Sequence, residues 1–185
     1  MALKNIVAPI EVDVTQINKT WYSGHKRKHP SPQYVIAFYQ RIKQSDNCRV
    51  KKLPDNKPET IEKFVRETIS APATIYCEQG ILPLALKKDY TVEELNAVGG
   101  EHVRGDIHIN NVKNVWKDLK RNIKREYISV SNEHLQGYCD EVSWHINNRN
   151  LSPGERFAKM IGATANGEHM TYRELTSRGP KKKSV

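Results

Sequence analysis

Cysteine is scarce in this 185-residue chain, and its three cysteines, Cys48, Cys77 and Cys139, do not form a recognisable set. Their number is odd and no two are separated by only two residues, which argues against a disulfide framework and against a zinc site. We therefore predict ordinary thiols in an intracellular, reducing compartment, whether the cytoplasm, a nucleoid or an organelle matrix.

Long apolar segments are missing as well. No stretch approaches the roughly 20 apolar residues that a membrane-spanning helix requires. Residues 1–9 contain no apolar core of the kind that a secretory signal has. The sequence therefore predicts a protein without a membrane partner.

Acidic residues are also few: the chain has 21 Asp and Glu but 30 Lys and Arg, which gives a net charge of +9. An excess of this size favours a polyanionic partner, and nucleic acid is the first candidate. A solvated basic surface would give the same composition, so charge alone does not decide between the two.

Hydrophobic periodicity predicts strands followed by helices. In the first expected strand, Ile10, Val12 and Val14 alternate with Glu11, Asp13 and Thr15, which gives one apolar and one polar face. Four strands are expected, at residues 6–15, 34–42, 48–53 and 74–77. A helix beginning at Pro58 precedes the fourth strand, a short helix is expected at 81–88, and residues 91–109 show no clear pattern.

The rest of the chain is expected to be helical, with one apolar stripe from Val112 to Ile123, a second from Leu135 to Ile146 and a third helix starting near Ser152. This order predicts an α/β fold with an RNase H-like mixed β-sheet flanked by helices and a helical C-terminal half. We expect one domain over residues 1–177 and a basic, disordered tail over 178–185.

Several motifs then occur in a fixed order. Residues 100–110 read GEHVRGDIHIN, 127–138 read YISVSNEHLQGY, and 170–175 read MTYREL. They resemble the "GEYVRGxxHTN", "YHxVSxKHLQRY" and "LTYREL" passages of ISXO-like insertion-sequence transposases, relatives of the Merlin elements. Residues 11–15 resemble the family's "EVDET", and Glu78 stands where the family has the Asp of "YTDE". The resemblance covers nearly the whole chain and is closest over residues 98–150.

The resemblance implies a DDE-type active site, in which carboxylates hold two Mg²⁺ ions that activate the attacking oxygen and stabilise the leaving oxygen. It assigns Asp13, Glu78 and Asn110 to the inherited catalytic positions. Asp13 and Glu78 would be the metal ligands of an active enzyme, and we expect their carboxylates to lie within about 8 Å of each other.

Two departures from the family pattern put activity in doubt. Glu78 replaces an aspartate, which displaces the carboxylate by about an ångström in a site that needs about 0.5 Å precision. Lys113 replaces the acid of the family's "HTNxxEG" motif, one turn after Asn110, and its charge would repel a cation. We therefore expect no bound metal or cofactor, with Lys113 reaching Asp13 or Glu78 in its place; Mg²⁺ is expected only if the enzyme is active.

Basic residues recur at helical spacing beside these positions and are expected opposite Trp116 and Leu119. This pattern favours contact with a nucleic-acid backbone, DNA or RNA, over base recognition, although a solvated helix face remains the alternative. The nucleic-acid-binding candidates are Lys113, Lys117, Lys120, Arg121 and Lys124, together with the loop residues Lys26, Arg27 and Lys28.

Two functions follow from these observations. The first is a domesticated, non-catalytic transposase-derived domain that binds nucleic acid, with other proteins of a nucleoprotein complex as further partners. The second is an active DDE transposase core that cleaves and transfers DNA strands with Mg²⁺. Family members carry a zinc-ribbon and helix-turn-helix region before the first strand, and we expect this chain to lack that end-recognition module. Together with Glu78 and Lys113, this favours the first function and leans against an enzyme.

Overall fold

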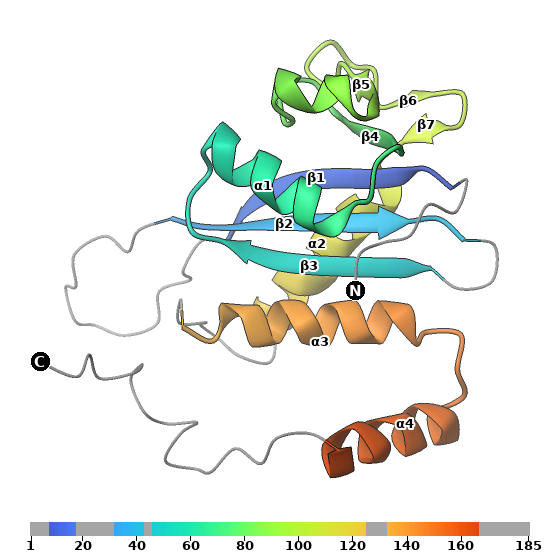
Figure 1. The fold of residues 1–185 in the computed structure, drawn as a ribbon. Helices are drawn as coiled ribbons and strands as arrows, with labels where there is room; N and C mark the ends of the chain where they lie inside the picture. The colour runs from blue at the N-terminus through green and yellow to red at the C-terminus, as the bar shows by residue number, and fades with distance from the viewer. Residues whose placement is uncertain (1–7, 18–31, 43–45, 125–132, 167–185) are drawn as a thin grey trace, which may run out of the picture. The chain divides into compact units, whose positions relative to one another are not determined.

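The computed structural model describes residues 8–17, 32–42, 46–124 and 133–166 (Figure 1). The chain divides into two compact units between Asn147 and Asn148, which are described separately below. The single domain expected over residues 1–177 stays a prediction. The loop with Lys26, Arg27 and Lys28 and the basic tail lie outside the described residues, as does the 170–175 motif.

The first unit is built on a mixed sheet of five strands in the order β3-β2-β1-β4-β5. Neighbours β1, β2 and β3 pair antiparallel, whereas β1, β4 and β5 pair parallel. The strands are β1 (Ile10–Ile17), β2 (Gln33–Gln40), β3 (Asn47–Leu53), β4 (Thr74–Glu78) and β5 (Thr91–Leu95). The predicted RNase H-like mixed sheet is therefore confirmed, with β1 ending two residues later than the periodicity indicated.

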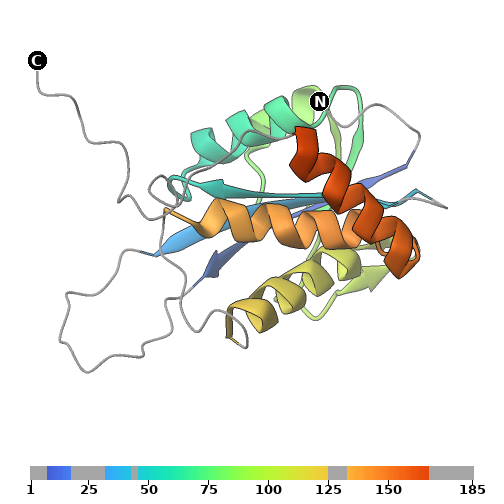
Figure 2. The same ribbon diagram turned by 90° about the horizontal axis from the view of Figure 1, so that it is seen from below.

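Helix α1 (Pro58–Thr68) covers one face of this sheet, while α2 (Asn110–Asn122) and α3 (Leu135–Asn147) cover the other (Figures 1 and 2). Proline at the first position favours the start of α1, because no backbone donor is lost there. Ile61 and Val65 of α1 then pack on Val12 and the rest of that apolar face of the sheet. The helices predicted after residue 110 are confirmed among the described residues.

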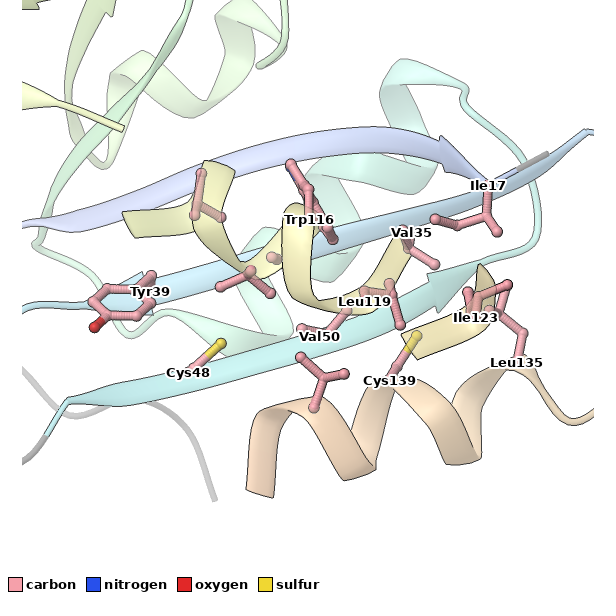
Figure 3. Close-up of a cluster of buried hydrophobic side chains, with 14 of the residues drawn as sticks. Ile17, Val35, Tyr39, Cys48, Val50, Trp116, Leu119, Ile123, Leu135 and Cys139 are labelled. Atoms are coloured by element: carbon pink, nitrogen blue, oxygen red, sulfur yellow. The ribbon is translucent and has the colours of Figure 1, made fainter. Parts of the chain in front are cut away.

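The core on the opposite face joins two strands to two helices. Val35 of β2 and Val50 of β3 lie in one buried cluster with Trp116 and Leu119 of α2 and with Leu135 of α3 (Figure 3). Because α2 and α3 share this cluster, the position of α2 over the sheet is fixed from two sides. This matters for the site, since α2 carries most of the candidate residues.

The strand β3 lies at an edge of the sheet, and α3 covers it with polar side chains. The backbone N–H groups of Cys48, Val50 and Lys52 donate to side-chain oxygens of α3, at 2.6, 2.9 and 2.8 Å. The acceptors are, in that order, Asn147 Oδ1, Ser143 Oγ and Gln136 Oε1. The helix thereby takes hydrogen bonds that a neighbouring strand would otherwise take, and the edge is closed to another chain.

The opposite edge strand, β5, was not identified from the sequence. It contains two adjacent acids, which obscure an alternating pattern, and both are paired in the fold. Glu93 binds Arg104 at 3.0 Å and Glu94 binds Lys87 at 2.6 Å. Charged side chains are typical of a short exposed edge. A 3₁₀ helix, η1 (Leu84–Lys88), precedes β5, and a hairpin of β6 (Val103–Arg104) and β7 (Ile107–His108) follows it.

The second unit contains α4 (Pro153–Asn166). Ser152 and Glu155 cap it reciprocally: the Ser152 N–H donates to Glu155 Oε2 at 2.8 Å, and the Glu155 N–H donates to Ser152 Oγ at 3.4 Å. The helix expected to start near Ser152 is thus confirmed. Among the helices that the structure describes, none combines the length and apolar character needed to cross a bilayer.

Candidate functional site

The polar face of β1 points at α2, and contacting residues recur at nearly equal distances along the two elements. Two strand residues advance about 6.6 Å and four helix residues about 6 Å, so alternate residues of β1 meet successive turns of α2. Glu11 binds the backbone of Asn111, Asp13 binds Trp116, and Thr15 binds Lys120, the last at 3.1 Å. The alternation of apolar and polar residues in β1 therefore does separate two faces of the strand, but a helix covers the polar face.

Asp13 lies under this helix with only 7% of its surface exposed. The indole N–H of Trp116 donates to Oδ2 at 2.8 Å, and the backbone N–H of Val14 donates to Oδ1 at 2.9 Å. Burial raises the pKa of Asp13 and outweighs these two hydrogen bonds, which lower it. Both carboxylate oxygens thus already have a protein donor.

Glu78 ends β4 on the same side of the sheet and forms an ion pair with Lys113. The paired residues Ile10–Ile75 and Glu11–Tyr76 set the register of β1 and β4, in which Asp13 and Glu78 each stand two residues beyond the last pair. The negative charge of Glu78 raises the pKa of Asp13, and the positive charge of Lys113 lowers it. The contact expected between Lys113 and Glu78 is confirmed, while the separation of about 8 Å between the two carboxylates stays a prediction.

Asn110 is the first residue of α2 and is exposed. It lines a pocket of about 230 Å³ together with Glu78, Lys113 and His102. The structure therefore gathers Glu78, Asn110 and Lys113 around one small pocket, with Asp13 further in, beneath Trp116. The three inherited positions lie in one region of the molecule.

The residues present do not fit the Mg²⁺ ions that the family uses. Mg²⁺ requires near-octahedral oxygen ligands at about 2.0–2.1 Å. Here Glu78 is neutralised by Lys113, both oxygens of Asp13 accept hydrogen bonds, and Asn110 offers a neutral amide. Within the described part of the chain, no cluster of three or more His, Cys, Asp or Glu side chains suits a metal ion.

Glu11 is a functional position that the sequence reasoning missed. Its side chain is fully buried and accepts hydrogen bonds from the backbone N–H groups of Asn111 and Val112, at 2.9 and 3.0 Å. The residue before α2, Ile109, has no side chain that can cap the helix, so Glu11 caps it from the neighbouring strand. The available signal was the spacing, because Glu11 lies two residues before Asp13 and so shares its face.

Arg41 completes this network after the end of β2. Its Nε lies 2.9 Å from Glu11 Oε1, and its terminal nitrogens donate to the carbonyl oxygens of Asp106 and His108 at 3.2 Å. The guanidinium also lies 5.3 Å from the ring centre of Tyr76. Asp106 is exposed in the turn between β6 and β7 and accepts from Arg41 through its backbone oxygen. Arg41 therefore fastens both the hairpin and the cap of α2 to the sheet.

The expectation that the basic residues after Asn110 lie opposite Trp116 is wrong for two of them. Two of them reach back to the sheet, Lys113 to Glu78 and Lys120 to Thr15. Arg121 is paired with Asp118 at 2.6 Å. Three exposed lysines form no ion pair with a carboxylate in the described ranges, and we call them the lysine row: Lys117, Lys120 and Lys124.

The raised pKa of Asp13 leads to a pH prediction. A carboxyl whose pKa is higher in the fold than in the unfolded chain stabilises the fold in its protonated form, and this contribution disappears as pH rises through the folded pKa. The free energy of unfolding of the wild type, minus that of Asp13→Asn, should therefore fall as pH rises above about 4, the ordinary pKa of an aspartate. Urea denaturation across this range measures it, with Asp118→Asn as a control at the surface of α2. A difference that rises with pH would contradict the direction assigned to Asp13.

Comparison with known proteins gives one match. Residues 8–147 match the ISXO2-like transposase domain. This match covers more than half of the chain and includes all five strands of the sheet. Searches of curated proteins and of solved structures returned no match. The matched residues include Asp13, Glu78 and Asn110, which the fold brings to one region, and the chain therefore belongs to the ISXO2-like transposase domain family.

Proposed function

We propose that this protein is a domesticated transposase domain that binds the backbone of a nucleic acid, DNA or RNA, without cutting it, as part of a larger nucleoprotein assembly. The observation that carries the proposal is the ion pair between Lys113 and Glu78. A lysine ammonium takes the place where the family chemistry needs a cation between carboxylates, so the positive charge comes from the chain itself.

The lysine row supplies the binding surface in this proposal. Lys117 and Lys120 lie on α2 and Lys124 lies in the helical turn directly after it, so the row is about 10 Å long and matches about three nucleotides at 3.4 Å per nucleotide. Lys120 is oriented by Thr15, and the row continues from the inherited site without a break, since Lys113 lies one turn before Lys117. A strand lying along the row would follow the same side of the fold as Asp13 and Glu78.

The test is the triple variant Lys117→Glu, Lys120→Glu and Lys124→Glu. Its affinity for duplex DNA and for single-stranded RNA should fall at least about a hundredfold, because attraction to three phosphates is replaced by repulsion. The slope of log affinity against log salt should fall by about 0.9 for each phosphate of duplex DNA that the variant no longer neutralises. Fluorescence anisotropy with labelled oligonucleotides measures both. The fold should survive, since all three side chains are exposed.

A matched control keeps the same change of charge elsewhere. Lys63, Lys87 and Lys88 are exposed on α1 and η1, and their change to glutamate should leave binding within about threefold. Equal reductions in both triple variants would show that only net charge matters and would contradict the lysine row. Strand nicking by the wild type with Mg²⁺ or Mn²⁺ that is abolished in Asp13→Ala would favour the active transposase core instead.

A further inference from the structure

A second pocket lies where β1 and β4 separate. The two strands pair only at Ile10–Ile75 and Glu11–Tyr76, although β1 continues to Ile17 and β4 to Glu78. Beyond this point the chain after β4 turns away through Gly80. Its φ of 80° is a backbone conformation that glycine adopts with little strain. The opening between the carboxyl ends of the two strands holds a pocket of about 350 Å³.

This position is the one where open α/β sheets bind ligands. From β1 the chain builds β2 and β3 on one side, then crosses through α1 to build β4 and β5 on the other side. The boundary between β1 and β4 is therefore the switch point of the topology, and the loops leave it in opposite directions. The crevice beyond the carboxyl ends of such strands is a general ligand site.

The lining combines flat apolar surfaces with hydrogen-bonding groups. Tyr34 and Ile61 come from β2 and α1, and Ile81 and Pro83 come from the segment after β4. The polar residues Thr15, Gln16 and Asn56 line the same pocket. A pocket of this size, with an aromatic ring and amide groups, suits a planar heterocycle that carries donors and acceptors on its edge.

The pocket lies on the α1 face of the sheet and the lysine row on the α2 face, and Thr15, at the carboxyl end of β1, contacts both. Thr15 lines the pocket and also accepts the hydrogen bond of Lys120. A nucleic-acid strand whose phosphates contact the lysine row lies beside the carboxyl end of β1, and a base turned around that end would reach the pocket. We propose that this pocket receives one unpaired nucleobase of the bound strand, which stacks against Tyr34 and hydrogen-bonds to Asn56. This inference rests on the proposed binding of nucleic acid to the lysine row and adds a contact to a base, where the row contacts phosphates alone.

The experiment compares two single strands about 12 nucleotides long that carry the same phosphates. One is oligothymidine and the other consists of abasic tetrahydrofuran residues. The wild-type chain should bind the base-bearing strand about tenfold more tightly, as expected for one stacked base. The variant Tyr34→Leu should abolish this difference while keeping its affinity for the abasic strand. Asn56→Ala, at an exposed position, should reduce it in part.

The control is Tyr138→Leu, which changes a tyrosine that is equally half-buried but packs in the other core cluster. It should keep the full preference for the base-bearing strand. Equal affinity of the wild type for both strands would overturn the nucleobase pocket and leave the proposed function intact. A preference retained by both Tyr34→Leu and Asn56→Ala would overturn it too. Failure of the wild type to bind either strand would overturn the proposed function together with this inference.

Discussion

Changing Lys113 to glutamate is expected to convert the inherited site into a divalent-cation site. The substitution removes the ammonium that neutralises Glu78 and adds a third carboxylate beside Glu78 and close to Asp13. Three carboxylates at one place repel each other, and a divalent cation relieves that repulsion while binding the oxygen ligands it prefers. The variant should bind Mn²⁺ at least about tenfold more tightly than the wild type.

Titration of Mn²⁺ followed by electron paramagnetic resonance of the unbound ion measures this affinity. Bound metal should also raise the melting temperature of the variant and leave that of the wild type unchanged, because only the variant gains from ligand binding. Lys117→Glu is the matched control, since it makes the same change of charge one turn further along α2, away from Glu78. If Lys117→Glu bound Mn²⁺ as tightly, general electrostatic attraction would account for the effect.

Much of this site followed from the sequence because its parts are local in the chain. Lys113 lies three residues after Asn110 at the start of a helix, and both positions were set by one motif. The alternation in β1 placed Asp13 on a defined face, and the resemblance to a family supplied Glu78 as its neighbour. The fold class followed from the order of strands and helices, which depends on periodicities of two and 3.6 residues.

The remaining features depend on contacts between segments distant in the chain. Glu11 was assigned only to the polar face of its strand, since no local pattern shows that the start of α2, a hundred residues later, needs a cap there. The strand β5 could not be identified from the sequence because its two adjacent acids, Glu93 and Glu94, interrupt the apolar pattern. Their charges are neutralised by Arg104 and Lys87 only in the folded chain. Likewise, the lysines were expected opposite Trp116, but Lys113 and Lys120 both reach the sheet.

The cap of α2 should be among the most sensitive points of the fold. Glu11 is completely buried and binds two backbone N–H groups of the helix, the side-chain amide of Asn111 and the guanidinium of Arg41. Its charge also faces the positive end of the helix dipole. Glu11→Ala leaves three donors of Asn111 and Val112 without their acceptor and Arg41 without its ionic partner. The free energy of unfolding should fall by about 3 kcal/mol, since removing one partner of a buried pair costs this much.

Two further variants separate the contributions of charge and of hydrogen bonding. Glu11→Gln keeps one acceptor oxygen for α2 but removes the charge that Arg41 faces, so its reduction in stability should be about half as large. Glu93→Ala, which breaks an exposed pair, should cost less than about 1 kcal/mol. Urea denaturation gives the three values, and hydrogen exchange should show the amides of Asn111 and Val112 exchanging faster in Glu11→Ala. Because α2 carries Lys113 and, in the lysine row, Lys117 and Lys120, loosening its first turn should also weaken nucleic-acid binding. A stable Glu11→Ala variant with protected amides would mean that packing of Trp116 and Leu119 alone holds the helix in place.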